Sequence, residues 1–277
     1  MALADDRLDP GANFAHGPPD PQKPTRSRSA LMQLFSRLFA RQTPPPAPMP
    51  PLNVPDPVAI IGDIHGCARL LDTLLDRIAT LAPQAAIVCV GDYIDRGDES
   101  AAVIDTLMGR PQITCLAGNH EAMLLAFLDD AAAKGPRWLR NGGLQTLASY
   151  GVAGPNADGT RPLDRVRDDL ALAMGDARIN WLRDRPKWMQ TGNLLITHAG
   201  ADPARAPQDQ DDRDLMWGHR DFMAVPRSDG LWVAYGHVIQ DAPSATDGRI
   251  ALDTGAYATG RLTAAGIHGD SVDFITT

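Results

Sequence analysis

Residues 58–66, VAIIGDIHG, join a short apolar run to a polar turn. The run at 58–61 predicts a buried β-strand that ends at a glycine. Asp63 and His65 lie two residues apart just beyond that strand, and they offer a carboxylate oxygen and an imidazole nitrogen. A borderline divalent metal accepts this pair of donors. Alone the pair is a weak signal, because either side chain can instead cap a turn.

The same arrangement recurs along the chain. Five apolar runs each end in residues that can bind a metal or transfer a proton, and ligands in parallel α/β sheets bind beyond the carboxyl ends of the strands. The five blocks are GDIHG at 62–66, GDYIDRG at 91–97, GNHE at 118–121, His198 and His237. This repetition predicts that the blocks meet in one site.

In their order, the blocks resemble the signature of the calcineurin-like metallophosphoesterases: D-x-H, G-D-x-x-D-R, G-N-H-E and two isolated histidines. The resemblance implies an α/β fold, a four-layer α/β/β/α sandwich, that holds two divalent metal ions. It assigns as metal ligands Asp63, His65, Asp92, Asn119, His198 and His237. Manganese is the expected metal, with iron or zinc as alternatives, since nitrogen and oxygen ligands accept all three.

The resemblance also assigns the catalytic roles. Asp92 is the carboxylate that two metals share, His120 is the general acid, and Asp95 orients His120. An imidazolium held by a carboxylate can donate a proton to a leaving alkoxide near neutral pH. Glu121 is interpreted as a negative charge at a helix N-terminus or as a support for the ligands. A hydroxide that bridges the metals is expected to attack phosphorus in line.

Arginines are expected to bind the phosphate group, together with Asn119. Arg96 lies in the GDYIDRG block, and its planar guanidinium can hold two phosphoryl oxygens. The stretches WLRNGG at 138–143 and LMWGHR at 215–220 resemble blocks of bacterial and phage-like serine/threonine protein phosphatases. Their arginines, Arg140 and Arg220, are therefore further candidates, and each is alternatively a solvated surface residue.

The chain departs from the protein-phosphatase pattern around the phosphate. Ala117 stands where the relatives often place an arginine, and Val238 and Ile239 replace a Thr-Pro pair. Because the metal residues are all present, the sequence predicts a phosphomonoester hydrolase, with a serine/threonine protein phosphatase as the main hypothesis. Hydrolysis of dinucleoside polyphosphates or another small phosphoester is the alternative. A catalytically inactive binding scaffold is the third hypothesis, which the complete set of metal and acid residues opposes.

Composition excludes several classes. A length of 277 residues with 44% hydrophobic residues supports one catalytic domain. The net charge of −8 argues against a nucleic-acid partner. Cys67, Cys89 and Cys115 are too few for a disulfide framework and indicate a reducing compartment, the cytoplasm. No apolar run approaches the roughly 18 residues of a membrane span, so a soluble chain is expected.

The domain organisation follows from changes in composition. Residues 1–57 are rich in proline and predict a disordered tail, interrupted by a short amphipathic helix at about 30–41 with basic flanks. That helix suits a membrane surface, and it equally suits the catalytic domain or a partner. Residues 58–277 form the predicted catalytic domain. Within it, residues 134–186 predict a helical cap that shapes the substrate cleft.

Overall fold

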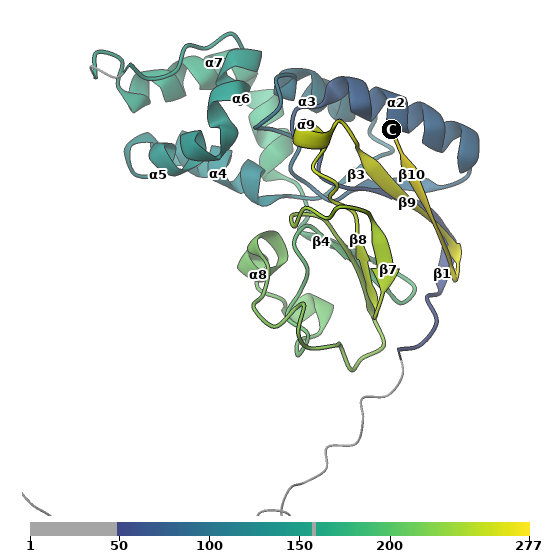
Figure 1. Cartoon of the computed structure of the whole chain (residues 1–277). Helices are drawn as coiled ribbons and strands as arrows, with labels where there is room; N and C mark the ends of the chain where they lie inside the picture. Colours follow the sequence, from purple (N-terminus) through teal and green to yellow (C-terminus); the bar gives the residue numbers. More distant parts are fainter. Residues whose placement is uncertain (1–48, 157–158) are drawn as a thin grey trace, which may run out of the picture. The chain divides into compact units, whose positions relative to one another are not determined.

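The computed structural model describes residues 49–156 and 159–277 (Figure 1). Most of the predicted proline-rich tail, with the amphipathic helix at about 30–41, lies outside the described residues. Two five-stranded sheets form the centre of the described chain. None of the described helices has the length and apolarity that crossing a bilayer requires.

The first sheet has the strand order β10-β9-β1-β2-β3. Its strands are β1 (Val54–Ile61), β2 (Ala86–Cys89), β3 (Thr114–Cys115), β9 (Thr263–Gly269) and β10 (Ser271–Thr276). β1, β2 and β3 are parallel neighbours, whereas β9 and β10 run antiparallel at the other side. The carboxyl ends of β1, β2 and β3 therefore lie at one edge, where the first three sequence blocks begin.

The second sheet has the order β4-β5-β6-β8-β7. Its strands are β4 (Trp188–Thr191), β5 (Leu194–Thr197), β6 (Trp232–Tyr235), β7 (Ser244–Thr246) and β8 (Arg249–Ala251). β5, β6 and β8 are parallel, and β4 and β7 pair antiparallel at the two sides. His198 follows β5 and His237 follows β6, so both histidines leave this sheet at the same edge.

Alternation of side chains along the strands builds the layers. Ile61 packs in a core with helices α2 (Ala68–Leu81) and α3 (Ser100–Met108), whereas its neighbour Ile60 packs between the two sheets. Figure 1 shows α2 and α3 along the first sheet. Leu195 packs on the outer face of the second sheet, against Leu215 of α8 (Asp212–Trp217). The predicted four-layer sandwich is confirmed, with a thin outer layer because α8 has only six residues.

β1 begins earlier than the sequence predicted. The structure starts this strand at Val54 rather than at Val58, and Leu52 and Val54 are both buried. The pairing with β9 shifts register between Val54 and Val58, where Pro55 and Pro57 lack N–H donors. Proline-rich composition predicted an extended tail up to residue 57, but the last residues of that stretch already belong to the sheet.

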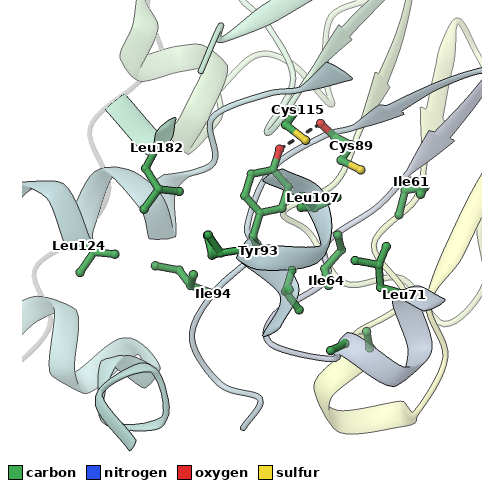
Figure 2. Close-up of a cluster of buried hydrophobic side chains, with 14 of the residues drawn as sticks. Ile61, Ile64, Leu71, Cys89, Tyr93, Ile94, Leu107, Cys115, Leu124 and Leu182 are labelled. Carbon is green, nitrogen blue, oxygen red and sulfur yellow. Dashed lines mark hydrogen bonds between the residues drawn. The ribbon is translucent and has the colours of Figure 1, made fainter. Parts of the chain in front are cut away.

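Most of the described part of segment 134–186 is helical. After α4 (Asn119–Asp129), the chain forms α5 (Ala131–Trp138), the π-helical turn η1 (Leu139–Gly143), α6 (Leu144–Ser149) and α7 (Leu163–Arg183). Figure 2 shows Leu182 of α7 near Leu124, Tyr93 and Ile94, and all four belong to one core. The Tyr93 hydroxyl donates to the Cys89 carbonyl at 3.4 Å. The helical segment therefore shares a core with the first sheet. Two short helices complete the described part, η2 (Pro207–Asp209) and α9 (Ala256–Thr259).

Candidate metal centre

The backbone is strained where the candidate residues lie. Among the described residues, six that are not glycine have positive φ angles, which cost of order 1–3 kcal/mol each. They are His65 (46°), Asp92 (53°), Asp95 (69°), Arg96 (69°), His237 (64°) and Asp247 (50°). Five of the six are site residues predicted from the sequence. Strain of this kind persists only where the surrounding structure enforces it, so the fold holds these side chains in fixed positions.

Asp63 joins the two sheets at the site. Its two carboxylate oxygens accept from the backbone N–H of His237 at 3.1 and 3.0 Å. A Cβ on Gly236 would lie 1.8 Å from Asp63 Oδ1, so only glycine allows this approach. The residue after β1 and the residue after β6 are thus held together, although 174 residues separate them in the chain.

The carboxylate of Asp92 lies among three histidines. Its Oδ2 atom is 3.4 Å from His198 Nε2, 3.6 Å from His65 Nε2 and 3.9 Å from His120 Nε2. Its Oδ1 atom accepts from the His120 backbone N–H at 3.0 Å. A Cβ on Gly118 would lie 2.2 Å from that oxygen, so glycine is required there too. One carboxylate therefore faces residues that follow three different strands.

Asn119 and the orientation of His65 complete the donor set. Asn119 Oδ1 is 2.8 Å from His198 Nε2 and 2.9 Å from His237 Nδ1. His65 Nδ1 donates to the Ile94 carbonyl at 2.9 Å, which leaves Nε2 to face Asp92. Fixing a histidine through its other ring nitrogen is usual for metal ligands. The described chain thus presents oxygen and nitrogen donors that converge from both sheets.

The electrostatics of the carboxylates call for a cation. Burial raises the pKa of Asp63, and the carboxylates of Asp253 and Asp92 raise it further. Burial would also raise the pKa of Asp92, but the neighbouring His198, His120 and His65 hold it well below its usual value. Buried carboxylates this close together repel one another unless positive charge lies between them.

The histidines respond to the same charges. Burial lowers the pKa of His198, but Asp92 and Asp63 outweigh it and raise the pKa to about 9. Burial lowers the pKa of His65 to about 3 and that of His237 to about 4. The buried Nδ1 atom of His198 has no hydrogen-bond partner within the described chain.

These residues fit divalent metals. The described residues include three groups whose ligand atoms lie within 4.8 Å of one another, and two of these groups contain Asp92. One group is His65, Asp92 and His120, and the other is Asp92, His198 and His237. Buried carboxylate and imidazole donors are the set that zinc, manganese and iron accept.

His120 and Asp95 form a buried pair beside this centre. His120 Nδ1 is 2.7 Å from Asp95 Oδ2, and His120 Nε2 faces the Asp92 carboxylate. Burial lowers the pKa of His120, but Asp92 and Asp95 outweigh it and raise the pKa above its usual value. A histidine held in this way has its protonated form favoured and can donate a proton from Nε2.

The sequence did not predict that Trp138 and Thr146 bind Asp95. Trp138 Nε1 donates to both carboxylate oxygens at 3.0 and 3.1 Å, and Thr146 Oγ1 donates to Oδ1 at 2.6 Å. The Asp95 backbone N–H also donates to Thr146 Oγ1 at 2.9 Å. The WLRNGG block had marked Trp138, but nothing in the sequence singled out Thr146. The helices after α4 therefore hold the orientation of the His120–Asp95 pair.

Glu121 supports the backbone rather than facing the donor groups. Its carboxylate accepts from the N–H groups of Asp92 and Tyr93, both at 2.8 Å, and of Gly118 at 2.9 Å. Burial, followed by the charge of Asp92, raises its pKa to about 7. These hydrogen bonds tie the turn after β2 to the N-terminus of α4, which agrees with the supporting role expected for this residue.

Of the three candidate arginines, Arg96 alone lies at the centre. Its charge acts on His65, His120 and His237, and its backbone N–H donates to the Gly142 carbonyl at 3.3 Å. Arg140 is exposed and forms no hydrogen bond or ion pair with other described residues. The Arg220 side chain is 87% exposed, and its nearest charge is Asp221 at 3.5 Å.

The LMWGHR block lies mainly on the outer face of the second sheet. His219 of this block groups with Asp202 and Asp214 instead of with the main centre. His219 Nδ1 accepts from the Asp221 N–H at 3.3 Å, and its Nε2 atom is 3.9 Å from the Asp202 carboxylate. The structure therefore does not bring Arg220 to the residues around Asp92.

Comparison with known proteins agrees with the fold. Residues 56–241, more than half of the chain, match the family model of the calcineurin-like phosphoesterases. The chain belongs to this family. The cold-active protein-tyrosine phosphatase of a Shewanella species has a similar fold, with a TM-score of 0.52 and 16% identity over 82% of each chain.

The curated relatives fall into two groups. The symmetrical bis(5'-nucleosyl)-tetraphosphatase of Janthinobacterium sp. (strain Marseille) is 33% identical over 144 residues, 52% of this chain and 43% of that protein. Serine/threonine-protein phosphatase 2 of Salmonella typhimurium is 26% identical over 216 residues, 73% of this chain and 89% of that protein. The chain spans less than half the length of the first curated relatives, at 43%, 37% and 46%.

Proposed function

We propose that this chain is a phosphomonoester hydrolase that depends on two divalent metal ions and acts on phosphorylated serine and threonine side chains of proteins. The observation that carries the proposal is the Asp92 carboxylate, whose Oδ2 atom lies 3.6 Å from His65 Nε2 and 3.4 Å from His198 Nε2, with the His120–Asp95 pair next to it. Asp63, His65 and Asp92 would hold one ion. The second ion would be held by Asp92, Asn119, His198 and His237.

The metals would supply Lewis acidity toward the phosphoryl oxygens. The chain's own residues do the remaining work. Arg96 binds phosphoryl oxygens through its guanidinium, since its charge already acts on the histidines of the site. His120 donates the proton from Nε2 to the departing serine or threonine oxygen. Asp95 accepts from His120 Nδ1 and keeps the ring oriented while it does so.

Two observations bear on the substrate. The Salmonella serine/threonine phosphatase aligns over 89% of its length, and the Gly142 carbonyl of the WLRNGG block accepts from Arg96 at the site. These favour a protein substrate. The Janthinobacterium tetraphosphatase is more similar in sequence over a shorter stretch, which supports dinucleoside polyphosphates as the second candidate.

We infer a cytoplasmic location from the thiols. Cys67, Cys89 and Cys115 are all free, and two of them lie in the buried core. Cysteines persist as thiols in a reducing compartment.

A substrate panel tests the proposed function. The full chain, loaded with manganese, iron or zinc, would be assayed for release of phosphate from a phosphoserine peptide and for cleavage of diadenosine tetraphosphate. We expect kcat/KM to be at least about tenfold higher for the peptide, and Asp92→Asn to abolish both activities. A higher value for the dinucleotide would favour the second candidate. If neither substrate is turned over with any of the three metals, both candidate functions are contradicted. The hypothesis of a catalytically inactive binding scaffold would then remain.

A further inference from the structure

Three large apolar side chains are exposed beside the metal centre. Val238 is 46% exposed, Ile239 is 45% exposed and Tyr257 is 39% exposed. Val238 and Ile239 directly follow His237, whose ring faces Asn119 Oδ1. Exposed apolar side chains that gather at a polar site often mark a binding surface. We call these three residues the apolar rim.

The residues of the rim come from two segments that lie against each other. The Gln240 N–H donates to the Asp253 carbonyl at 2.8 Å, which holds the chain after β6 against the turn that precedes α9. A side chain at Gly255 would meet Ile239 Cγ2 at 3.2 Å, so Ile239 covers the start of α9. Tyr257 lies two residues further along the same helix.

Tyr257 connects the rim to the phosphate side of the site. Its ring meets that of His65 edge to face, with centroids 5.4 Å apart and planes at 83°. The Arg96 guanidinium carbon lies 5.0 Å from the Tyr257 ring centroid, and Arg96 donates to the Tyr257 hydroxyl at 3.4 Å. A phosphate bound by Arg96 would therefore have the Tyr257 ring next to it, with the aliphatic part of the rim beyond.

We propose that the apolar rim binds an apolar or aromatic side chain next to the phosphorylated residue of a protein substrate. The inference rests on the proposed phosphatase function and adds its sequence preference. A phenylalanine in that position can stack on the Tyr257 ring and pack against Val238 and Ile239, which removes apolar surface of both partners from water. A polar side chain there would leave the rim exposed and would gain nothing.

The test compares two phosphoserine peptides, one with phenylalanine on both sides of the phosphoserine and one with serine on both sides. Burying about half of a phenyl group corresponds to an advantage on the order of tenfold in kcat/KM. We expect the unmodified protein to prefer the phenylalanine peptide by about that factor. The same ratio should appear in the affinities for peptides that carry a non-hydrolysable phosphonate in place of the phosphate.

Substitutions in the rim should remove the preference. The double variant Val238→Ser/Ile239→Ser should bring the ratio between the two peptides to below about twofold. Tyr257→Ala should also lower the ratio, and it should slow both peptides because Arg96 loses its aromatic partner. Leu172→Ser is the matched control, since Leu172 is 84% exposed on α7 and belongs neither to the rim nor to the metal centre. It should keep both the ratio and the rates.

Two results would overturn the inference in distinguishable ways. Equal kcat/KM for both peptides in the unmodified protein, or a ratio that survives in the double variant, would refute the rim and leave the proposed phosphatase function standing. Absence of turnover and of phosphonate binding for both peptides would refute the proposed function itself, and the rim's role with it.

Discussion

Replacing Asp95 with asparagine tests how the general acid is held. Asp95 is completely buried, and its carboxylate accepts from His120, Thr146 and Trp138. The amide has nearly the same volume, so the main change is the loss of a negative charge 2.7 Å from His120 Nδ1. Burial lowers the pKa of His120, and Asp92 and Asp95 together raise it above its usual value. Removing one of the two carboxylates therefore lowers that pKa.

The size of the effect depends on the leaving group. A positioned general acid contributes about 10²–10⁴-fold, and most of that is needed when the leaving group is basic. We expect Asp95→Asn to lose at least about 10²-fold in kcat for a phosphoserine peptide near neutral pH. For 4-nitrophenyl phosphate, whose phenolate leaves without a proton, the loss should be smaller than about tenfold.

The pH profile gives a second measurement. Protonated His120 is the active form, so the rate falls as the pH rises through its pKa. With that pKa lowered, the descending limb for the phosphopeptide should move to lower pH in Asp95→Asn. Thr146→Val is the matched control, because it removes one hydrogen bond to Asp95 and keeps the charge. Its descending limb should move much less than that of Asp95→Asn.

The outcome is decisive only if the metals stay bound, so the metal content of each variant would be measured. Losses of equal size for the two substrates, or a descending limb that does not move, would refute the reasoning if the metal content is unchanged. Asp95 would then support the fold without acting through His120.

Three further predictions concern the metals, the phosphate and the N-terminal boundary. Asp92→Asn should leave fewer than about one metal ion per chain after dialysis, because both groups of metal ligands share the Asp92 carboxylate. Two metal ions retained in this variant would contradict the shared site. Arg96→Ala should lower kcat/KM on the order of ten- to a hundredfold, because a contact with phosphate worth about 1.5–3 kcal/mol is lost. Arg220 is exposed, so Arg220→Ala should change kcat/KM less than about twofold. Equal losses in the two variants would place Arg220 at the phosphate. Deleting residues 1–48 should leave the free energy of unfolding in urea unchanged, whereas deleting residues 1–57 should lower it by about 3–6 kcal/mol, because the buried side chains of Leu52 and Val54 are lost. Equal stability of the two truncations would argue against the start of β1 at Val54.

Local sequence determined the fold and the order of the metal-type residues. The end of a strand is marked by a short apolar run, then a glycine, then a polar residue. These three signals lie within a few residues of one another, so they can be recognised from local sequence. Asp63 follows β1, Asp92 follows β2 and Asn119 follows β3, all as predicted from such runs. Because parallel strands end at one edge, the pattern also predicted that these side chains would meet. The predicted start of β1 was wrong. Pro55 and Pro57 indicated an extended tail, whereas the structure pairs this segment with β9 on both sides of a register shift.

Only the tertiary structure decided which other side chains surround the site. Thr146 reaches Asp95 from 51 residues away, and Tyr257 reaches Arg96 from 161 residues away. Asp253 adds its charge to that of Asp63 from the turn after β8. A threonine in a helix or an exposed tyrosine has no distinctive local pattern, because the same residue types occur throughout helices and surfaces. Their roles arise from packing between distant segments, which local periodicity and spacing do not encode.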